Sequence, residues 1–331
     1  MKRWNGSKLF GSLALPLVLS LWTQPAQASH VACGDTIVAD TVLDDSLLNC
    51  PGDGIIVGAD GVTVHLNGQI VDGSNTVDSV GIKIVGRTGV TVKGPGVVKQ
   101  FDKGIRIIGG GEHTVKGVTV ANNRLPQFTC ATTPPGVRPT GIEVINSGRT
   151  TIKGVAAVNN CRGITLVGPD AQKNKVKENS LNLNFFFGVL VRNGAHDNEI
   201  EKNAVTGTTN GPGVLLGQNV SENEVTRNFI HSNVVGVSLQ GNADRNVVKR
   251  NVITNNGAVG VRLTIDIPFL AVFDNDENEI RENVIGNQTT GVLIQSPTDD
   301  GNVIKDNAFF DTPTPISDSG TGTIISGNVT D

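Results

Sequence analysis

The chain of 331 residues contains no tyrosine, one methionine and two tryptophans, and aromatic residues make up 4% of it. Met1, Trp4 and Trp22 all lie within the first 28 residues. The remainder therefore lacks the Trp and Tyr rings on which sugars commonly stack, and it has no tyrosine to act as a catalytic acid or base. These absences disfavour recognition of neutral glycans.

The first 28 residues have the pattern of a secretory signal. Basic residues 2, 3 and 8 precede an apolar run over residues 9–21, which is too short to span a membrane, and Ala26-Gln27-Ala28 forms a small-residue cleavage site. No second long apolar run follows. We expect a secreted or periplasmic protein, cut near Ala28/Ser29, with no membrane span.

Removal of this segment leaves 24 basic and 31 acidic side chains, a formal charge of about −7. Proteins that bind nucleic-acid duplexes are usually basic overall. We therefore expect no nucleic-acid partner.

Four cysteines follow the predicted signal, and an even number in an oxidising compartment favours disulfides over free thiols. Their spacing suggests a Cys33–Cys50 bridge across the N-terminal segment. A Cys130–Cys161 bridge would join a long loop to the next repeat.

A repeated unit organises most of the chain: Gly, then Ile or Val, then any residue, then an aliphatic residue. Successive glycines are 22 to 37 residues apart. The unit begins at Gly54, Gly81, Gly104, Gly141, Gly163, Gly188, Gly213, Gly236, Gly260 and Gly291. About ten residues after these strands, from Asn174 onward, comes a second motif, Asn-x-(Ile or Val)-x-x-Asn, and a third short apolar strand follows it. Three short strands per unit, without helical periodicity, predict one turn of a parallel β-solenoid.

The closing asparagines of the second motif should lie one above another. Stacked amides can hydrogen-bond along such a column. We also expect these asparagines to occupy a corner where the chain turns into the left-handed conformation, which Asn tolerates. The predicted column contains Asn179, Asn203, Asn228, Asn251, Asn283, Asn307 and Asn328.

These repeats resemble the right-handed parallel β-helix repeats of pectate-lyase-like enzymes and of the periplasmic accessory β-helix of nitrous oxide reductase maturation. The resemblance implies an all-β, single-stranded right-handed parallel β-helix of about eleven coils with three short strands per coil. We divide the chain into a signal peptide (1–28), an N-terminal cap (29–53) and the parallel β-helix (54–331). The same fold serves enzymes, adhesins and accessory proteins.

The residue between the two aliphatics of each first strand should face outward, because alternate side chains point to opposite faces. The column comprises Ile56, Lys83, Arg106, Glu143, Thr165, Leu190, Leu215, Ser238, Arg262 and Leu293. Three successive charged residues, Lys83, Arg106 and Glu143, form its polar cluster, and the insertion 123–140 beside them carries Arg138.

Resemblance to β-helix polysaccharide enzymes implies a site on this face. Elimination or epimerisation of a uronate needs a cation to neutralise the carboxylate, a base and a proton donor. The candidate catalytic residues are Lys83 or Arg106 as neutraliser or base, Glu143 or Asp102 as acid or orienting partner, and Arg138. The alternative is a solvated row of salt bridges on an exposed sheet.

The second strands present a largely basic outward column. Seven of its ten residues are Lys or Arg, so it could bind an acidic polysaccharide or an envelope polyanion. The alternative is that these lysines keep the sheet soluble. The column comprises His65, Lys93, Lys116, Lys153, Lys177, Glu201, Thr226, Lys249, Arg281 and Lys305.

Acidic residues of two neighbouring turns form a candidate metal site. They are Asp274, Asp276, Glu277, Asp299 and Asp300. Oxygen ligands converging from adjacent coils would suit Ca²⁺, the one candidate cofactor. Copper, which the accessory-protein resemblance implies, favours His, Cys and Met. The histidines at positions 65, 113, 196 and 231 fall on different coils or edges, which leaves His30 for an amino-terminal site.

The sequence thus supports a protein that binds, and could process, an acidic polysaccharide. Two alternatives stay open: a noncatalytic envelope scaffold or adhesin, and a periplasmic metal-accessory protein. The oligomeric state cannot be derived from the sequence.

Overall fold

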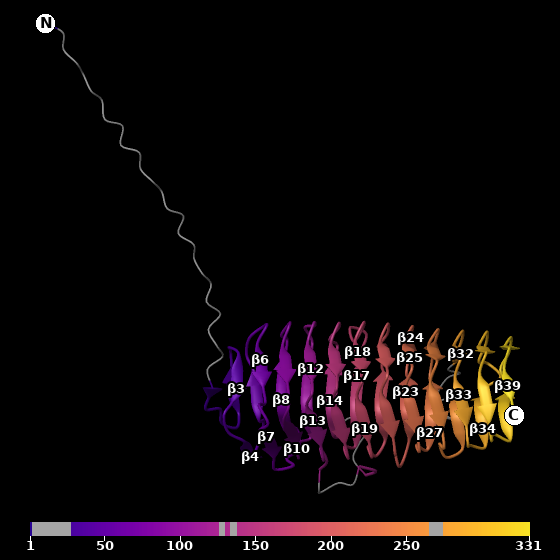
Figure 1. Ribbon diagram of the computed structural model, residues 1–331, viewed down its shortest axis with the longest axis horizontal. Coiled ribbons are helices and arrows are strands. Elements are labelled where there is room, and N and C mark those ends of the chain that lie inside the picture. Colours follow the sequence, from indigo (N-terminus) through magenta and orange to yellow (C-terminus); the bar gives the residue numbers. More distant parts are fainter. Residues whose placement is uncertain (2–27, 126–129, 133–137, 265–273) are drawn as a thin grey trace.

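The computed structural model describes Met1 and residues 28–125, 130–132, 138–264 and 274–331. The predicted signal segment therefore lies outside the described residues, apart from its two ends. Figure 1 shows the strands of successive coils stacked along the long axis of the molecule. No helix that could cross a membrane occurs in the described ranges.

Three long parallel sheets run the length of the molecule, and each coil contributes one strand to each sheet. We call them sheets A, B and C. Sheet B contains the strands of the glycine unit and carries the candidate site. Its strands are β2 (Asp35–Ile37), β5 (Ile55–Val57), β8 (Val80–Val85), β11 (Lys103–Ile108), β14 (Thr140–Ile145), β17 (Arg162–Val167), β20 (Phe187–Arg192), β23 (Pro212–Gly217), β27 (Val235–Gln240), β31 (Val259–Thr264), β34 (Thr290–Ile294) and β37 (Thr314–Asp318).

Sheet A contains the second strand of each coil and, at its N-terminal edge, β1. Its strands are β1 (Ala28–Ser29), β3 (Thr41–Leu43), β6 (Thr63–His65), β9 (Thr91–Lys93), β12 (Thr114–Lys116), β15 (Thr151–Lys153), β18 (Lys175–Lys177), β21 (Glu199–Glu201), β25 (Glu224–Thr226), β29 (Val247–Lys249), β32 (Glu279–Arg281), β35 (Val303–Lys305) and β38 (Ile324–Ser326).

Sheet C contains the third strands, and a two-stranded sheet lies between sheets B and A. Sheet C comprises β4 (Leu47–Cys50), β7 (Ile70–Gly73), β10 (Val97–Lys99), β13 (Thr119–Ala121), β16 (Ala156–Val158), β19 (Ser180–Asn182), β22 (Ala204–Thr206), β26 (Phe229–His231), β30 (Val252–Thr254), β33 (Val284–Gly286), β36 (Ala308–Phe310) and β39 (Val329–Thr330). The small sheet pairs β24 (Val220–Ser221) with β28 (Ala243–Asp244).

The prediction of a right-handed parallel β-helix with three strands per coil is confirmed. The expected number of about eleven coils was one too low, because sheets B and C each contain twelve strands. The additional coil is formed by β2, β3 and β4, which precede the first glycine unit and lack its pattern. They lie in the segment assigned to the N-terminal cap; β2 and β4 end sheets B and C, and β3 is followed only by β1 at the edge of sheet A.

The interior is filled by the aliphatic residues of every strand. In β8, Ile82 and Ile84 are fully buried, whereas Lys83 between them faces out and is partly exposed. The glycine of the unit also faces inward: a methyl group at Gly81 would collide with Val98 and Phe101. The glycine is therefore required by close packing of the core.

The predicted asparagine column is confirmed. From Asn179 to Asn328, each Nδ2 donates to Oδ1 of the asparagine in the next coil, over 2.9–3.0 Å. The expected left-handed conformation was assigned to the wrong residue. It occurs one position earlier, at Glu178 and Lys202 for example, where φ is 56° and 54°. The chain therefore turns at an exposed or partly exposed residue. The side chain of the buried asparagine that follows hydrogen-bonds to backbone N–H and carbonyl groups of neighbouring coils.

The opening asparagines of the same motif, from Asn174 to Asn302, form a second amide ladder. A third series, which the sequence analysis missed, includes Asn123, Asn160 and Asn184. Most corners of the coils are thus closed by buried amides.

Both suggested disulfides are present, and the Cα atoms of each pair are 5.4 Å apart. Cys33–Cys50 closes the first coil. Cys130–Cys161 joins the long insertion to the turn before β17, where it packs against Phe186. The second bridge fixes the described end of the insertion beside sheet B.

Candidate functional site

The strand register confirms that the predicted column of sheet B is aligned, but its middle members are buried, from Glu143 to Ser238. Lys83 pairs with Arg106, Arg106 with Glu143, and Glu143 with Thr165. The same register continues through Leu190, Leu215 and Ser238 to Arg262. The structure therefore brings Lys83, Arg106 and Glu143 together on one face.

Each of the first cations of this face has a carboxylate partner. Lys83 Nζ lies 2.9 Å from Asp53 Oδ2, and Arg106 Nε lies 2.9 Å from Glu143 Oε2. Asp102, a candidate acid, instead binds Lys103 Nζ at 2.9 Å, and both side chains are almost completely buried. Asp102 therefore positions Lys103 and does not face the solvent.

Two arginines that the sequence analysis did not select join Arg138 at this site. Arg162 is the first residue of β17 and Arg192 the last residue of β20, on adjacent strands. Their long side chains approach each other and Arg138 closely enough for mutual repulsion. We call the group the basic cluster; it comprises Arg106, Arg138, Glu143, Arg162, Thr165 and Arg192.

Burial and like charge both act on the guanidinium groups. Burial, followed by repulsion from Arg192 and Arg138, lowers the pKa of Arg162 to about 10, although Glu143 opposes the shift. The pKa of Arg138 is lowered by burial and then by Arg192. Four guanidinium groups, which remain protonated in proteins, thus meet one carboxylate. The cluster therefore has a strong excess of positive charge.

Several buried polar atoms of the cluster lack hydrogen-bond partners in the described structure. They include Nε of Arg138, Nε of Arg192 and Oγ1 of Thr165, and Thr165 is fully buried. Arg138 and Arg192 also form no ion pair with a described carboxylate. Buried donors without partners are costly. The described residues therefore leave these polar atoms without hydrogen bonds.

An apolar cluster supports one side of the basic cluster. The Arg138 guanidinium lies 4.0 Å from the centre of the Phe186 ring, which packs on the Cys130–Cys161 disulfide. Phe185 and Phe187 flank it, with ring centres 4.8 and 5.9 Å from that of Phe186. One phenyl ring therefore contacts a guanidinium group, and two further rings pack on that ring.

The strand pattern explains why Arg162 was missed. The residue immediately before each glycine of the unit forms a second aligned column: Lys103, for example, pairs with Val80 and with Thr140. The glycine itself faces inward and is not among the paired residues. This column contains Val80, Lys103, Thr140 and Arg162, none of which belongs to the interior core. The sequence analysis considered only the middle outward position. Aligning the residues before the glycines would have found Lys103 and Arg162.

The predicted basic column of sheet A is also confirmed by the register, from His65 to Lys305. Its N-terminal members Lys93, Lys116 and Lys177 form no ion pair with a described carboxylate. The C-terminal members do: Lys249 Nζ lies 2.8 Å from Glu224, and Lys305 Nζ 2.7 Å from Glu279. Lys153, in the N-terminal half, lies 3.2 Å from Glu178. The cations of the C-terminal half are therefore more completely paired than those of the N-terminal half.

The acidic residues proposed to bind Ca²⁺ contact backbone groups of neighbouring coils. Asp299 Oδ1 accepts from the Asn275 N–H at 2.9 Å, and Asp276 Oδ1 accepts from the Asp300 N–H at 2.8 Å. Glu277 lies 3.9 Å from Arg245, and Asp274 Oδ1 is buried without a described partner. The Ca²⁺ site stays a prediction.

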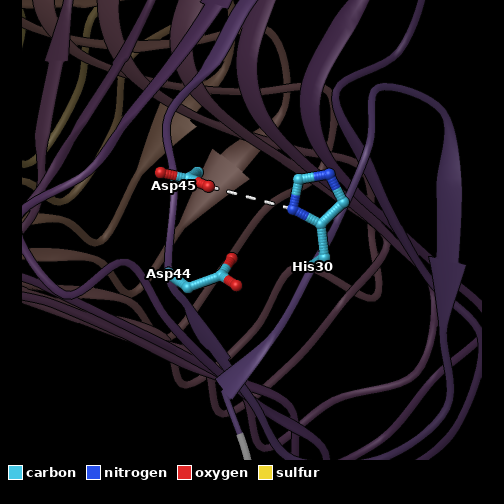
Figure 2. A group of neighbouring side chains, drawn as sticks. All are labelled: His30, Asp44 and Asp45. Carbon is cyan, nitrogen blue, oxygen red and sulfur yellow. Dashed lines mark ion pairs between the residues drawn. The ribbon is translucent and has the colours of Figure 1, made fainter.

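One group of three metal-ligating side chains with ligand atoms within 4.8 Å of one another occurs in the described ranges. It comprises His30, Asp44 and Asp45 on the N-terminal coil (Figure 2). The histidines of later coils lie apart, as expected; His113 is buried in a corner, and His196 pairs with Asp197 at 3.0 Å.

A separate polar hollow of about 190 Å³ lies at the turns after β11, β14 and β17, where Arg149, Asp170 and Lys173 line it. It lies beyond the C-terminal ends of these strands, whereas Arg138 and Arg162 lie at their N-terminal ends. None of the predicted site residues lines it, so we do not assign it to the site.

The sequence matches the family described as right handed beta helix region over residues 53–212 and again over residues 186–330. Together the two matches cover most of the chain, which therefore belongs to this family. No curated protein sequence matches it.

Solved structures with the same fold are distant in sequence. PfbA, a surface adhesin of Streptococcus pneumoniae, is 14% identical with a TM-score of 0.61, covering 86% of this chain and 80% of PfbA. An exopolygalacturonase from Thermotoga maritima is 11% identical with a TM-score of 0.59, over 88% and 83% of the two chains. A tailspike protein of E. coli bacteriophage HK620, solved with a pentasaccharide, is 11% identical with a TM-score of 0.60, over 88% and 58%. These similarities show the fold.

Proposed function

We propose that the protein is an extracytoplasmic β-helix protein that binds an acidic polysaccharide through the basic cluster on sheet B. The observation that carries the proposal is the convergence of four guanidinium groups beside one carboxylate, with Nε of Arg138 and Nε of Arg192 unused by the described residues. The two disulfides support an oxidising, extracytoplasmic location.

An anionic group would relieve the two unfavourable features of the cluster. Carboxylates accept bidentate hydrogen bonds from guanidinium groups, and such charge-assisted bonds are stronger than neutral ones. The added negative charge would also reduce repulsion among Arg138, Arg162 and Arg192. Binding is therefore favoured by both hydrogen bonding and charge.

The surroundings of the cluster favour a polymeric sugar over a small inorganic anion. Phe185 and Phe187, which are partly exposed on either side of the buried Phe186, offer apolar surface near Arg138. Such surface suits a ligand with both apolar and charged faces. β-helix proteins of similar structure include an exopolygalacturonase and a tailspike solved with a pentasaccharide. These neighbours support carbohydrate as the ligand class.

Processing of the polymer is a second candidate function, supported by the Arg106–Glu143 pair next to the cluster. In an elimination, a base removes the C5 proton of a uronate, the C4–O bond breaks, and a C4–C5 double bond forms. Arg106 would neutralise the carboxylate, and Lys83 and Glu143 are the candidate proton-transfer groups. A scaffold or adhesin would bind the same polymer without turnover.

Binding of a polyuronate should be measured by calorimetry, with an uncharged glucan as the reference ligand. We expect Arg138→Gln and Arg192→Gln each to weaken binding by about tenfold or more, the effect of one charged hydrogen-bonding group. Arg262→Gln is the matched control, since Arg262 lies in the same outward column as Arg106 but several coils away.

Absence of polyuronate binding, or an equal loss in Arg262→Gln, would contradict the proposed function. Absorbance of unsaturated products and the epimer ratio, measured on the same mixtures, test the processing candidate separately. Binding without either change would leave a noncatalytic binder.

A further inference from the structure

The N-terminal coil brings together three ligating side chains from two segments. In sheet A, Ser29 of β1 pairs with Leu43 of β3. The next residues of both segments, His30 on one side and Asp44 and Asp45 on the other, therefore lie beside each other. Figure 2 shows both carboxylates on the side of the turn that faces the imidazole.

We propose that His30, Asp44 and Asp45 bind a divalent transition-metal ion of the Zn²⁺ class. The ligand atoms lie within 4.8 Å of one another, and His30 Nδ1 is 3.8 Å from Asp45 Oδ2. This separation is too long for a hydrogen bond. It is close to the spacing of about 3.3 Å between two ligands of one tetrahedral Zn²⁺ ion.

The donor set determines the class of ion. One imidazole nitrogen and two carboxylate oxygens suit Zn²⁺ and its first-row neighbours. Ca²⁺ and Mg²⁺ prefer sites made of oxygen alone. A site with a single histidine and no sulfur also differs from the ligand set that favours Cu⁺.

The backbone around the site is held in place without the metal. The Leu43 carbonyl accepts from Asn67 Nδ2 at 3.1 Å, and the Asp44 carbonyl accepts from Gln69 Nε2 at 2.9 Å. On the other side, His30 lies between strand β1 and Cys33, which the first disulfide joins to Cys50. Little backbone ordering would therefore be required on binding, which favours affinity.

The two carboxylates are not neutralised by other groups. Within the described ranges, no Lys or Arg forms an ion pair with Asp44 or Asp45. Both carboxylates are exposed, as is the imidazole, with side-chain exposures of 80% for His30 and 76% for Asp45. An ion could therefore enter from solvent and keep one open coordination position.

The predicted signal cleavage would complete the site. A chain that begins at Ser29 has its α-amino group one residue before His30, and an amine is a further nitrogen donor. The proposal does not require this group, because the three side chains suffice for a metal ion with bound water.

Titration of chelator-treated, purified protein with Zn²⁺ tests the site, with the N-terminus determined by intact mass. We expect one equivalent to bind and to raise Tm, because a ligand of the folded state stabilises it. His30→Ala, Asp44→Asn and Asp45→Asn should each weaken binding by about tenfold or more. His231→Ala, which removes a histidine on a distant coil, should bind as the original protein does.

No binding at about 1 mM Zn²⁺, or unchanged binding in His30→Ala, would overturn the proposal. So would loss in His30→Ala with unchanged binding in both aspartate variants, which would indicate the amino terminus alone. The three side chains are exposed, so the variants should fold, and circular dichroism checks this. Polyuronate binding does not involve these residues, so either proposal can fail without the other.

Discussion

The N-terminal and C-terminal halves of sheet A are built from equivalent strands and share one outward column. They differ in how many cations of this column form ion pairs. In the N-terminal half, Lys93 and Lys116 have Thr91 and Thr114 as their strand partners on the outer face. In the C-terminal half, that threonine column contains Glu224 and Glu279, which pair with Lys249 and Lys305. In the N-terminal half, only Lys153 of the column's lysines has a carboxylate partner among the described residues, Glu178, whereas the cations of the C-terminal half are paired.

The two halves of the molecule also differ in the residues that form the corners before and after the strands of sheet A. From Asn174 onward they are closed by continuous amide ladders. In earlier coils the equivalent positions hold His113, Thr150 and Val155. The basic cluster and the long insertion begin in this less regular half. The proposed binding cluster thus lies in the half with the longest insertion, and the longest regular amide ladders lie in the other half.

The largest expected effect comes from interrupting an amide ladder. Asn228 Nδ2 donates to the Ile200 carbonyl and to Asn251, and its Oδ1 accepts from the Asn203 N–H. Asn228→Ala leaves these buried groups without partners and should lower the free energy of unfolding by about 3–4 kcal/mol. Denaturant unfolding measures the change.

Asn210→Ala is the control for this experiment. Asn210 is exposed, and its described hydrogen bond is made by its backbone. A loss of similar size in both variants would show that the ladder has no special role.

A smaller effect is expected at Asp299, a buried acid that accepts hydrogen bonds from the backbone and the side chain of Asn275. Burial raises the pKa of Asp299 to about 6 from 3.8. Ionisation is therefore disfavoured in the folded state, so stability should fall as pH rises from 3.8 to about 6 and stay level above. Asp299→Asn should add about 2–3 kcal/mol at neutral pH and nothing below pH 3.5.

Unfolding free energies of both proteins across this pH range test the expectation. A constant difference at every pH would contradict an effect of ionisation. The same variant also tests the predicted Ca²⁺ site, because Ca²⁺ that raises the Tm of the original protein should no longer do so in Asp299→Asn.

His113 should give a still smaller effect of the opposite sign. Burial lowers the pKa of His113 below 6.5, and its Nδ1 accepts the Val90 N–H, which requires a neutral ring. Stability should therefore be complete above pH 6.5 and decrease as the pH falls below it. His113→Asn should remove this acid sensitivity. Unfolding curves at neutral and acidic pH provide the measurement, and unchanged acid sensitivity in the variant would contradict it.

Substitutions in the basic column should have the smallest effect on stability but a clear effect on binding to an anionic polymer, and this effect should differ between the two halves of the column. Replacement of Lys93, Lys116 and Lys177 by Gln should shorten retention on an anionic polymer, most strongly at low salt. Replacement of Lys249, Arg281 and Lys305 should change retention less, because carboxylates already neutralise these cations. Both triple variants should unfold within about 1 kcal/mol of the original protein. Equal losses of retention would remove the distinction between the halves.

Most of the fold could be predicted because it depends on local repetition. The glycine unit and the alternation around it determine which side of each strand is buried, so the columns from Ile56 to Leu293 and from His65 to Lys305 were obtained from spacing alone. The first coil was not, because β2, β3 and β4 contain no glycine unit. The left-handed corner was assigned one residue late. The position is occupied by Glu, Lys, Arg or Asp, and this mixture of residue types does not indicate a left-handed backbone.

The candidate site was predictable only in its central column. Lys83, Arg106 and Glu143 lie on one face as expected, whereas Arg162 and Arg192 start at opposite ends of their strands and converge through long side chains. Such convergence depends on side-chain conformation and on the position of Phe186, neither of which follows from spacing. The pairing of Asp102 with Lys103, its neighbour in sequence, likewise required the structure.

Each strand pairs only with the equivalent strands of the coils before and after it. Adding or removing a whole coil would therefore shift one end of the molecule relative to the other by one strand spacing, about 4.8 Å, without altering any contact farther away. The distance between the histidine-containing turn at one end and the arginines in the middle can thus change in fixed steps. The length of such a molecule can therefore change during evolution without changing the residues of either proposed site.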